Sequence, residues 1–514
     1  MRSTISSNLC AWVRLLISAA LTLVFLTPLA QASGEKRVTV PIALPFQQAT
    51  SAQVSSTAPS AAATLPAPNA IQPMAFTQAP APEVAALYSS AASSSAVAVS
   101  SVAQVVKASS AATSSMAPAA TAAVAKEARP AAVNIPVITT APIKAPRYPV
   151  GHPEAFVAEF EDYIAKKVAP FVPGVAVVIV SGGQIKSLNG YGVRRAGTRE
   201  TITPDTVFRL ASLSKPVAAT SASVLVNEGK IAWDTTITSV LPNVTFSNAR
   251  YGKQLTLRHV LSQSSGLPRH TYSHFIDAGK SYADTVARLR YVNFVCPPGK
   301  CFAYQNVPYS LSGEMIKKKA GMSFEQYTEE KIFDPLGMRS ASYGLNSYNA
   351  SPNRAAPHVN NGKRWIPTAV TGNWYRVAPA AGVNASIVDM SRFLLAQMGK
   401  RQDVLPLSVL NPIQSRVTKN TPAQNYYGVR KAVGNTAYGM GWRVFDYGRN
   451  KNFIHHGGHV KGFRTEMVFN RDLQIGMVFL SNSETRLARD VIFKFLDSYE
   501  RAQVAAREAA KKKK

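Results

Sequence analysis

The composition of this 514-residue chain changes abruptly near residue 147, and that change limits where a folded domain can lie. From about residue 33 to residue 146 the chain consists mainly of Ala, Ser, Pro, Val and Thr, with few aromatic residues and no sustained apolar period. Such a segment buries too little apolar surface to offset the entropy of ordering it. We therefore expect a disordered tether at 33–147 and a single folded domain at 148–500.

The segment 1–32 has the pattern of a secretory signal. Two arginines within the first 14 residues precede an apolar run at 15–30, and Ala30-Gln31-Ala32 offers small residues for cleavage. The alternative is an uncleaved membrane anchor, but the run is shorter than the roughly 20 residues that span a bilayer and contains Pro28. Cys10 precedes the run instead of ending it, which argues against a lipid-modified cysteine. We expect export to the periplasm or cell envelope.

Two of the three cysteines, Cys296 and Cys301, enclose the segment Pro-Pro-Gly-Lys. An oxidising compartment would permit them to form a disulfide just before Tyr304. The closed loop is short, so its entropic contribution would be small. The alternative is two unpaired surface thiols.

The formal charge is +29, and four lysines close the segment 501–514, which we expect to be a basic tail. This charge predicts attraction to anionic surfaces, and export makes the cell envelope the favoured partner. The alternative is a solvated basic surface that only keeps the protein soluble. No nucleic-acid-binding motif accompanies the charge, so nucleic acid is the least favoured partner.

Both ends of the predicted domain carry strand patterns next to a helix. An apolar helix face that begins at Phe156 precedes strand-like runs at 174–180 and 184–193, and a second pair at 464–470 and 473–482 precedes a final helix. We therefore predict an α+β fold in which both ends build one antiparallel sheet flanked by the terminal helices. The middle of the chain would form a mainly helical second lobe, with the site between the lobes.

The strongest chemical signal is the segment FRLASLSK at 208–215. A three-residue step places Ser212 and Lys215 on one face at a predicted helix start. Burial would lower the pKa of the lysine, so that a neutral amine could accept the serine proton, and the helix N-terminus favours developing negative charge. The pattern alone also occurs on solvated helix faces, so the interpretation needs further motifs.

Two such motifs are YQN at 304–306 and HGG at 456–458, the latter opening a late strand. With them the chain resembles the serine β-lactamase and penicillin-binding superfamily. The resemblance is greatest to the branch of class C β-lactamases, D,D-carboxypeptidases, D-aminopeptidases and related esterases. It covers roughly 173–482 and includes these further segments: TPDT at 203–206, LTLR at 255–258, SSGLP at 264–268 and YGMGW at 438–442.

The resemblance implies a role for each residue of the first two motifs. Ser212 would be acylated, Lys215 would share its proton, and Tyr304 would act as general base or acid toward the leaving group. Asn306 would hydrogen-bond the substrate amide, and water would release the acyl group. The structural alternatives are that Tyr304 fills the core and that Asn306 is a turn residue.

For the third motif, the resemblance implies a substrate-binding role for His456 and Gly458. The backbone N–H groups of Ser212 and His459 would form the oxyanion hole. His456 stands where β-lactamases have the lysine of Lys-Thr-Gly, and a neutral imidazole binds a carboxylate less well at pH 7. Efficient β-lactam hydrolysis is therefore not expected. The structural alternatives are a buried histidine and a strand bulge at the glycines.

The histidines of this segment also raise the question of a metal site. On a strand His456 and His459 would face opposite sides. His455 and His459 would share a side but lie roughly 13 Å apart at about 3.3 Å per residue, which is too far for one ion. We expect no metal, and no residue pattern indicates a cofactor.

The sequence thus predicts an exported serine hydrolase that acts on amides or esters, with D-amino-acid peptides of the cell wall as one substrate class. The alternative is a non-hydrolytic protein that binds penicillin or peptidoglycan in the same cleft. A nucleic-acid-binding protein ranks third. The hydrolase is favoured because a pure binder has no need to keep Ser212, Lys215 and Tyr304 together.

Overall fold

The computed structural model describes residues 140–422 and 424–513. The predicted signal at 1–32 and the predicted tether up to residue 139 lie outside the described residues. Among the described helices, none combines the length and the apolar character that a bilayer-crossing segment needs.

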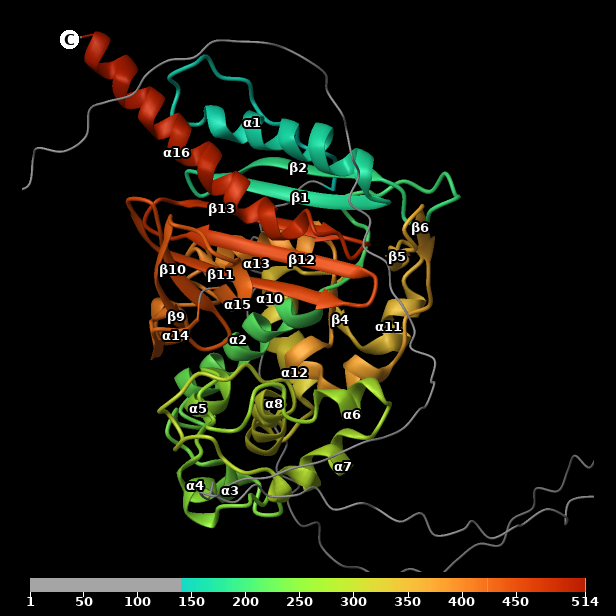
Figure 1. The fold of residues 1–514 in the computed structure, drawn as a ribbon, viewed down its shortest axis with the longest axis vertical. Coiled ribbons are helices and arrows are strands. Elements are labelled where there is room, and N and C mark those ends of the chain that lie inside the picture. Colours follow the sequence, from blue (N-terminus) through green and yellow to red (C-terminus); the bar gives the residue numbers. More distant parts are fainter. Residues whose placement is uncertain (1–139, 423, 514) are drawn as a thin grey trace, which may run out of the picture. The chain divides into compact units, whose positions relative to one another are not determined.

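An antiparallel sheet of eight strands forms the centre of the described domain (Figure 1). Across the sheet the strands are β2 (Gln184–Gly192), β1 (Gly174–Ser181), β13 (Ile475–Ser481), β12 (Phe463–Asn470), β11 (Asn450–Val460), β10 (Arg443–Tyr447), β9 (Val433–Tyr438) and β8 (Thr418–Lys419). The two ends of the domain meet where β1 pairs with β13, from Val175 opposite Ser481 to Val180 opposite Gly476. The fold predicted from the two terminal hairpin patterns is therefore confirmed.

The terminal helices α1 (Ala155–Tyr163) and α16 (Ala488–Lys512) pack together over one face of this sheet (Figure 1). The ring of Phe495 lies 5.8 Å from that of Phe156 and 5.3 Å from that of Phe160. These rings belong to a buried apolar cluster that α1 and α16 share with this face of the sheet. Burial of apolar surface therefore joins the first and last elements of the domain.

The middle of the chain supplies a mainly helical lobe on the other face. Its helices are α2 (Ser214–Asn227), α3 (Ile237–Val240), α4 (Ala249–Gln254), α5 (Leu257–Leu261), α6 (Ser273–Asp277), α7 (Tyr282–Ala287), α8 (Val307–Ala320), α9 (Phe324–Thr328), α10 (Asp334–Leu336), α11 (Gly344–Ala350), α12 (Ala378–Ala381), α13 (Ile387–Gln397) and α14 (Leu407–Gln414). The short helix α15 (Gln424–Tyr427) instead contributes Tyr427 to the cluster that α1 and α16 share. Two small sheets accompany them: β3 (Phe208–Arg209), β7 (Val383–Ala385) and β4 (Ser342–Tyr343), and β5 (His358–Asn360) with β6 (Trp365–Pro367).

The structured region extends beyond the predicted domain bounds at both ends. Ile143 pairs with Leu188 of β2, and the Ala145 N–H donates to the buried Glu161 carboxylate at 2.9 Å, so contacts with the domain begin before residue 148. At the other end α16 continues through most of the predicted tail, 501–514, to Lys512. Alanines alternate there with charged residues, and alanine has the highest helix propensity, so the helix continues.

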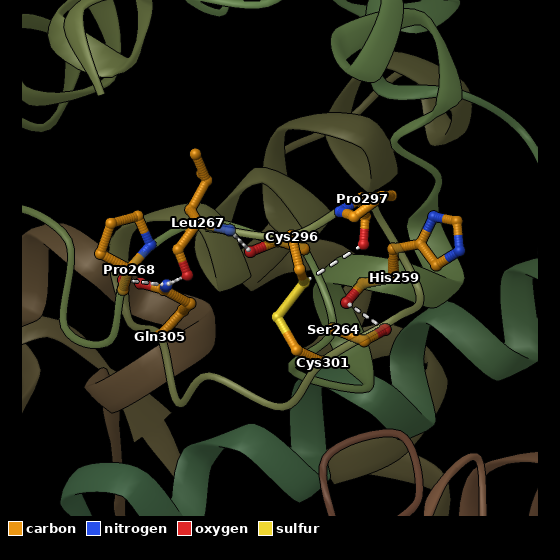
Figure 2. Close-up of a disulfide and its surroundings, with 9 residues drawn as sticks. His259, Ser264, Leu267, Pro268, Cys296, Pro297, Cys301 and Gln305 are labelled. Carbon is orange, nitrogen blue, oxygen red and sulfur yellow. Dashed lines mark hydrogen bonds between the residues drawn. A yellow bond between two sulfur atoms is a disulfide. The ribbon is translucent and has the colours of Figure 1, made fainter. Parts of the chain in front are cut away.

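A disulfide joins Cys296 and Cys301 in the loop that leads to Tyr304 (Figure 2). The SSGLP segment holds this loop from the other side, because the Gly299 N–H donates to the Ser264 carbonyl at 2.8 Å. Just beyond the disulfide, the Gln305 side chain donates to the Leu267 carbonyl at 2.9 Å. The disulfide and these hydrogen bonds together position the segment that carries Tyr304.

We expect the double variant Cys296→Ser/Cys301→Ser to lose about 2 kcal/mol of unfolding free energy, because closing so short a loop constrains the unfolded chain only modestly. Urea denaturation of both proteins measures the difference. Wild type treated with a reductant is the control and should shift by the same amount. An unchanged midpoint in the double variant would contradict a stabilising disulfide.

Candidate active site

Ser212 lies in a short 3-10 turn directly before α2. The residue before it, Ala211, has a φ of +50°, a left-handed conformation that is unfavourable for a residue with a side chain. Two hydrogen bonds hold this turn. Ser214 donates to the Ala211 carbonyl at 2.7 Å, and Thr465 of β12 donates to the Leu210 carbonyl at 2.9 Å. Ser212 therefore sits on a strained turn that the sheet and α2 keep in place.

Lys215 is completely buried, and its Nζ lies 3.5 Å from Ser212 Oγ. The same Nζ donates to Asn306 Oδ1 at 2.8 Å and to the Ala380 carbonyl at 3.1 Å. Burial, with a smaller contribution from the nearby Arg443, holds the pKa of Lys215 well below its usual range. A neutral amine has two N–H donors and one lone pair. Since the two carbonyl oxygens accept the two donors, the lone pair is left for the Ser212 hydroxyl.

Tyr304 is also hydrogen-bonded to Ser212. The Nζ of Lys215 lies 4.7 Å from the centre of its ring. Burial raises the pKa of Tyr304, although the Arg443 charge and the hydrogen bond with Ser212 act in the opposite direction. The phenol is therefore protonated at neutral pH and suited to donate a proton, while Lys215 is suited to accept one.

Asn306 is the residue that precedes α8, and both ends of its amide are engaged. Its Oδ1 accepts from Lys215, and its Nδ2 donates to Ser273 Oγ at 3.1 Å. Asn306 lines the pocket beside Ser212, as the resemblance implied. In this arrangement it orients the lysine, and its Nδ2 would reach a substrate carbonyl only by exchanging the Ser273 contact.

The HGG motif lies in the second half of β11, which begins at Asn450, and does not open the strand as the sequence suggested. The polar residues 450–452 concealed the strand start, because a β10–β11 hairpin exposes them. β10 pairs with β11 only as far as Arg443 opposite His455. Beyond that point β11 lines the pocket with its Gly457–Val460 backbone.

Both glycines of the motif are required by close contacts. A Cβ at Gly458 would lie 2.1 Å from the Leu210 carbonyl oxygen, so glycine lets β11 approach the turn that carries Ser212. A Cβ at Gly457 would lie 1.9 Å from the Tyr426 hydroxyl and 2.2 Å from Glu466 Oε2. Ser212, Gly458 and the next residue, His459, consequently line one pocket, where the resemblance implied an oxyanion hole.

His456 is buried behind the pocket wall and is not at its surface. Its Nε2 lies 3.0 Å from the Tyr438 hydroxyl, and its Nδ1 lies 2.9 Å from the Gly457 carbonyl. Burial, then the charges of Arg443 and Lys215, hold the pKa of His456 well below its usual range. The resemblance implied direct substrate binding, but His456 does not line the pocket, because its neighbours enclose the ring.

The other two histidines of the segment have separate partners. His455 Nε2 lies 2.8 Å from Glu466 Oε2, and its Nδ1 lies 3.0 Å from the Tyr427 hydroxyl. The exposed His459 has its Nε2 3.6 Å from Glu484. Within the described ranges no cluster of three or more His, Cys, Asp or Glu side chains is arranged to hold a metal ion.

The pocket, about 460 Å³ in volume, also contains arginines that the motif analysis missed. Arg443 directly follows the YGMGW segment, and its guanidinium lies 4.3 Å from the ring centre of Tyr426 and 5.4 Å from that of Tyr304. Its Nε has no hydrogen-bond partner in the described part of the chain. The nearby Glu466 carboxylate is occupied by His455 and Tyr426. This cation is therefore available to an anion in the pocket.

We expect Lys215→Met to remove a pH dependence of stability. The unfolded chain binds a proton at Lys215 below pH 10.5, and the native chain does not until its lowered pKa is reached. Unfolding free energy should therefore rise with pH between those two pKa values in wild type, relative to the variant. Urea denaturation of both proteins at several pH values below 10 measures this difference. A difference independent of pH would mean that native Lys215 is charged.

Comparison with known proteins places this geometry in a family. The family model described as Beta-lactamase matches residues 160–494. Similar relatives include the unguisins hydrolase ungD' of Aspergillus campestris, 26% identical over 61% of this chain and 59% of that protein, and penicillin-binding protein 4 of Amycolatopsis lactamdurans, 28% identical over 35% and 47%. The chain thus spans about half to three fifths of the length of these two relatives.

The octameric penicillin-binding protein homologue from Pyrococcus abyssi has a similar fold, with a TM-score of 0.57 and 24% identity over 66% of this chain and 77% of that one. The chain belongs to the beta-lactamase family, within the serine β-lactamase and penicillin-binding superfamily.

Proposed function

We propose that this protein is a serine acyl hydrolase that cleaves amides or esters whose leaving group carries a carboxylate. The observation that supports it most is the contact set of Lys215. Its Nζ contacts Ser212 Oγ, Asn306 Oδ1 and the Ala380 carbonyl, so a neutral amine can keep its two N–H groups on the last two and offer its lone pair to the serine proton. A lysine buried only to fill the core would not need a serine hydroxyl beside its amine nitrogen.

In the proposed mechanism Lys215 accepts the Ser212 proton as Oγ attacks the substrate carbonyl. The bond to the leaving group then breaks, and Tyr304 donates its proton to the departing nitrogen or oxygen. The protonated Lys215 returns its proton to Tyr304 through the Ser212 region. A water molecule then attacks the acyl carbon while Lys215 accepts the water proton. The bond between Ser212 Oγ and the acyl carbon breaks, Lys215 returns the proton to Oγ, and the acid product leaves.

Arg443 supports a carboxylate on the leaving group. Its guanidinium lies near the ring of Tyr304, the proposed proton donor to that group. A planar guanidinium binds a carboxylate through two parallel hydrogen bonds. Peptides that end in a D-amino acid have this chemistry, and one similar protein bears the name penicillin-binding protein. We include export in the proposal, because an oxidising compartment would maintain the Cys296–Cys301 disulfide.

The second candidate function is a penicillin-binding protein that is acylated but turns over slowly. Both functions require Ser212, so acylation alone does not separate them. Continued release of product does, since a slow acyl-enzyme gives one product per protein and then stops.

The test is intact-mass spectrometry of residues 140–514 with penicillin, a p-nitrophenyl ester and a D-Ala-D-Ala peptide, while product is followed. We expect an adduct or turnover in wild type and neither in Ser212→Ala, because only the Ser212 hydroxyl becomes acylated. Ser239→Ala, an exposed serine on α3, is the matched control and should behave as wild type. Equal activity in Ser212→Ala would refute the proposed nucleophile.

We expect Arg443→Gln to lower kcat/KM for a peptide with a free C-terminal carboxylate by about ten- to a hundredfold. The same peptide as its C-terminal amide should lose much less, because it offers no charge to the guanidinium. Steady-state kinetics on both substrates measure the two ratios. Equal losses for both peptides would mean that Arg443 acts on the catalytic groups and does not bind the carboxylate.

A further inference from the structure

A second pocket arginine, Arg464 on β12, has no role in the chemistry above. It lines the pocket with Ser212, although only 9% of its surface is exposed. In the part of the chain that the structure describes, no hydrogen bond or ion pair joins its side chain to another residue. The nearest carboxylate on its strand, Glu466, is held by His455 and by the Tyr426 hydroxyl. A buried guanidinium without a counter-ion is costly, so an occupant of the pocket would stabilise it.

The strand register separates Arg464 from Arg443. Arg443 lies opposite His455 of β11, and Arg464 lies opposite His459 of the same strand. Four residues of strand place these positions about 13 Å apart along β11. Gly458, the residue that contacts the nucleophile turn, lies between them. The two arginines therefore stem from strand positions on either side of Gly458 along β11.

Tyr304 shows which arginine lies near the leaving group and which lies near the acyl group. This tyrosine protonates the leaving group in the proposed mechanism, and Arg443 lies 5.4 Å from its ring centre. Arg443 is therefore on the leaving-group side. Arg464, beyond Gly458, lies on the side of the acyl group.

The rest of the pocket adds positive charge. Arg269 lines it from the loop after SSGLP, next to His270, whose pKa burial lowers and whose ring is therefore not counted as a charge. The one acidic residue among those lining it, Asp277, accepts a hydrogen bond from the Trp374 indole at 2.7 Å. An anionic acyl group would therefore enter a field of opposite sign.

We propose that Arg464 forms a second anion-binding subsite and that the acyl group of the natural substrate carries a carboxylate. This inference rests on the proposed function and adds the substrate class: amides or esters with a carboxylate on each side of the scissile bond. The acyl-side carboxylate forms a bidentate pair with the Arg464 guanidinium.

The test compares two p-nitrophenyl esters that differ only in the acyl group, succinyl and butyryl. Their leaving group has no carboxylate, so recognition by Arg443 does not enter the comparison. We expect wild type to prefer the succinyl ester in kcat/KM, and Arg464→Gln to lose about tenfold on it with little change on the butyryl ester. Lys461→Gln is the matched control, since it removes the same charge from an exposed residue outside the pocket lining.

Two outcomes overturn the subsite: equal losses on both esters in Arg464→Gln, or no preference for the succinyl ester in wild type. If Arg464→Gln does not fold, competitive inhibition of wild type by succinate and by butyrate decides the question. Succinate should inhibit more strongly, and equal inhibition overturns the inference. Hydrolysis by Ser212→Ala at the wild-type rate would instead refute the proposed function, so the two failures are distinguishable.

Discussion

The burial of the Lys215 amine is the constraint on which the rest of the site depends. Its hydrogen-bond partners come from separate places in the chain: Ser212 precedes α2, Asn306 precedes α8, and Ala380 belongs to α12. Only the packed helical lobe brings these groups together. The same packing removes water, which lowers the pKa of the lysine and makes it a base at neutral pH. The fold thus produces both the geometry and the protonation state that the chemistry needs.

The sheet contributes the other half of the site through two close approaches to β11. Gly458 lets the strand contact the turn that carries Ser212, and Gly457 leaves room for the Tyr426 hydroxyl.

Arg443 affects both the proposed catalytic groups and the binding of substrate. Its charge contributes to the lowered pKa of Lys215 and opposes the rise in the pKa of Tyr304, while its guanidinium is open to an anion. A single residue therefore favours the neutral amine of Lys215, makes the Tyr304 phenol a stronger acid and offers a charge to a carboxylate.

Much of the architecture was predictable, because the sheet and its flanking helices have strong local patterns. Apolar runs of strand length at both ends indicated the hairpins that β1 and β13 join. The errors have physical causes. The polar start of β11 concealed that HGG lies late in the strand, and the alanine-rich basic segment extends α16 where a separate tail was expected. His456 was assigned to the substrate, but Tyr438 and the strand enclose it.

The sequence by itself determined that Ser212 and Lys215 lie together, because a three-residue spacing at a helix start places both side chains on one face. The YQN motif added Tyr304 only through resemblance to a family. The tertiary structure alone decided that Arg443 and Arg464 belong to the same pocket. β10, β11 and β12 are consecutive strands, but the turn with Ser212 and the loop with Tyr304 come from far earlier in the chain, and only tertiary packing brings them to these arginines. The charge of the pocket, and so the substrate class that we propose, depends on that packing.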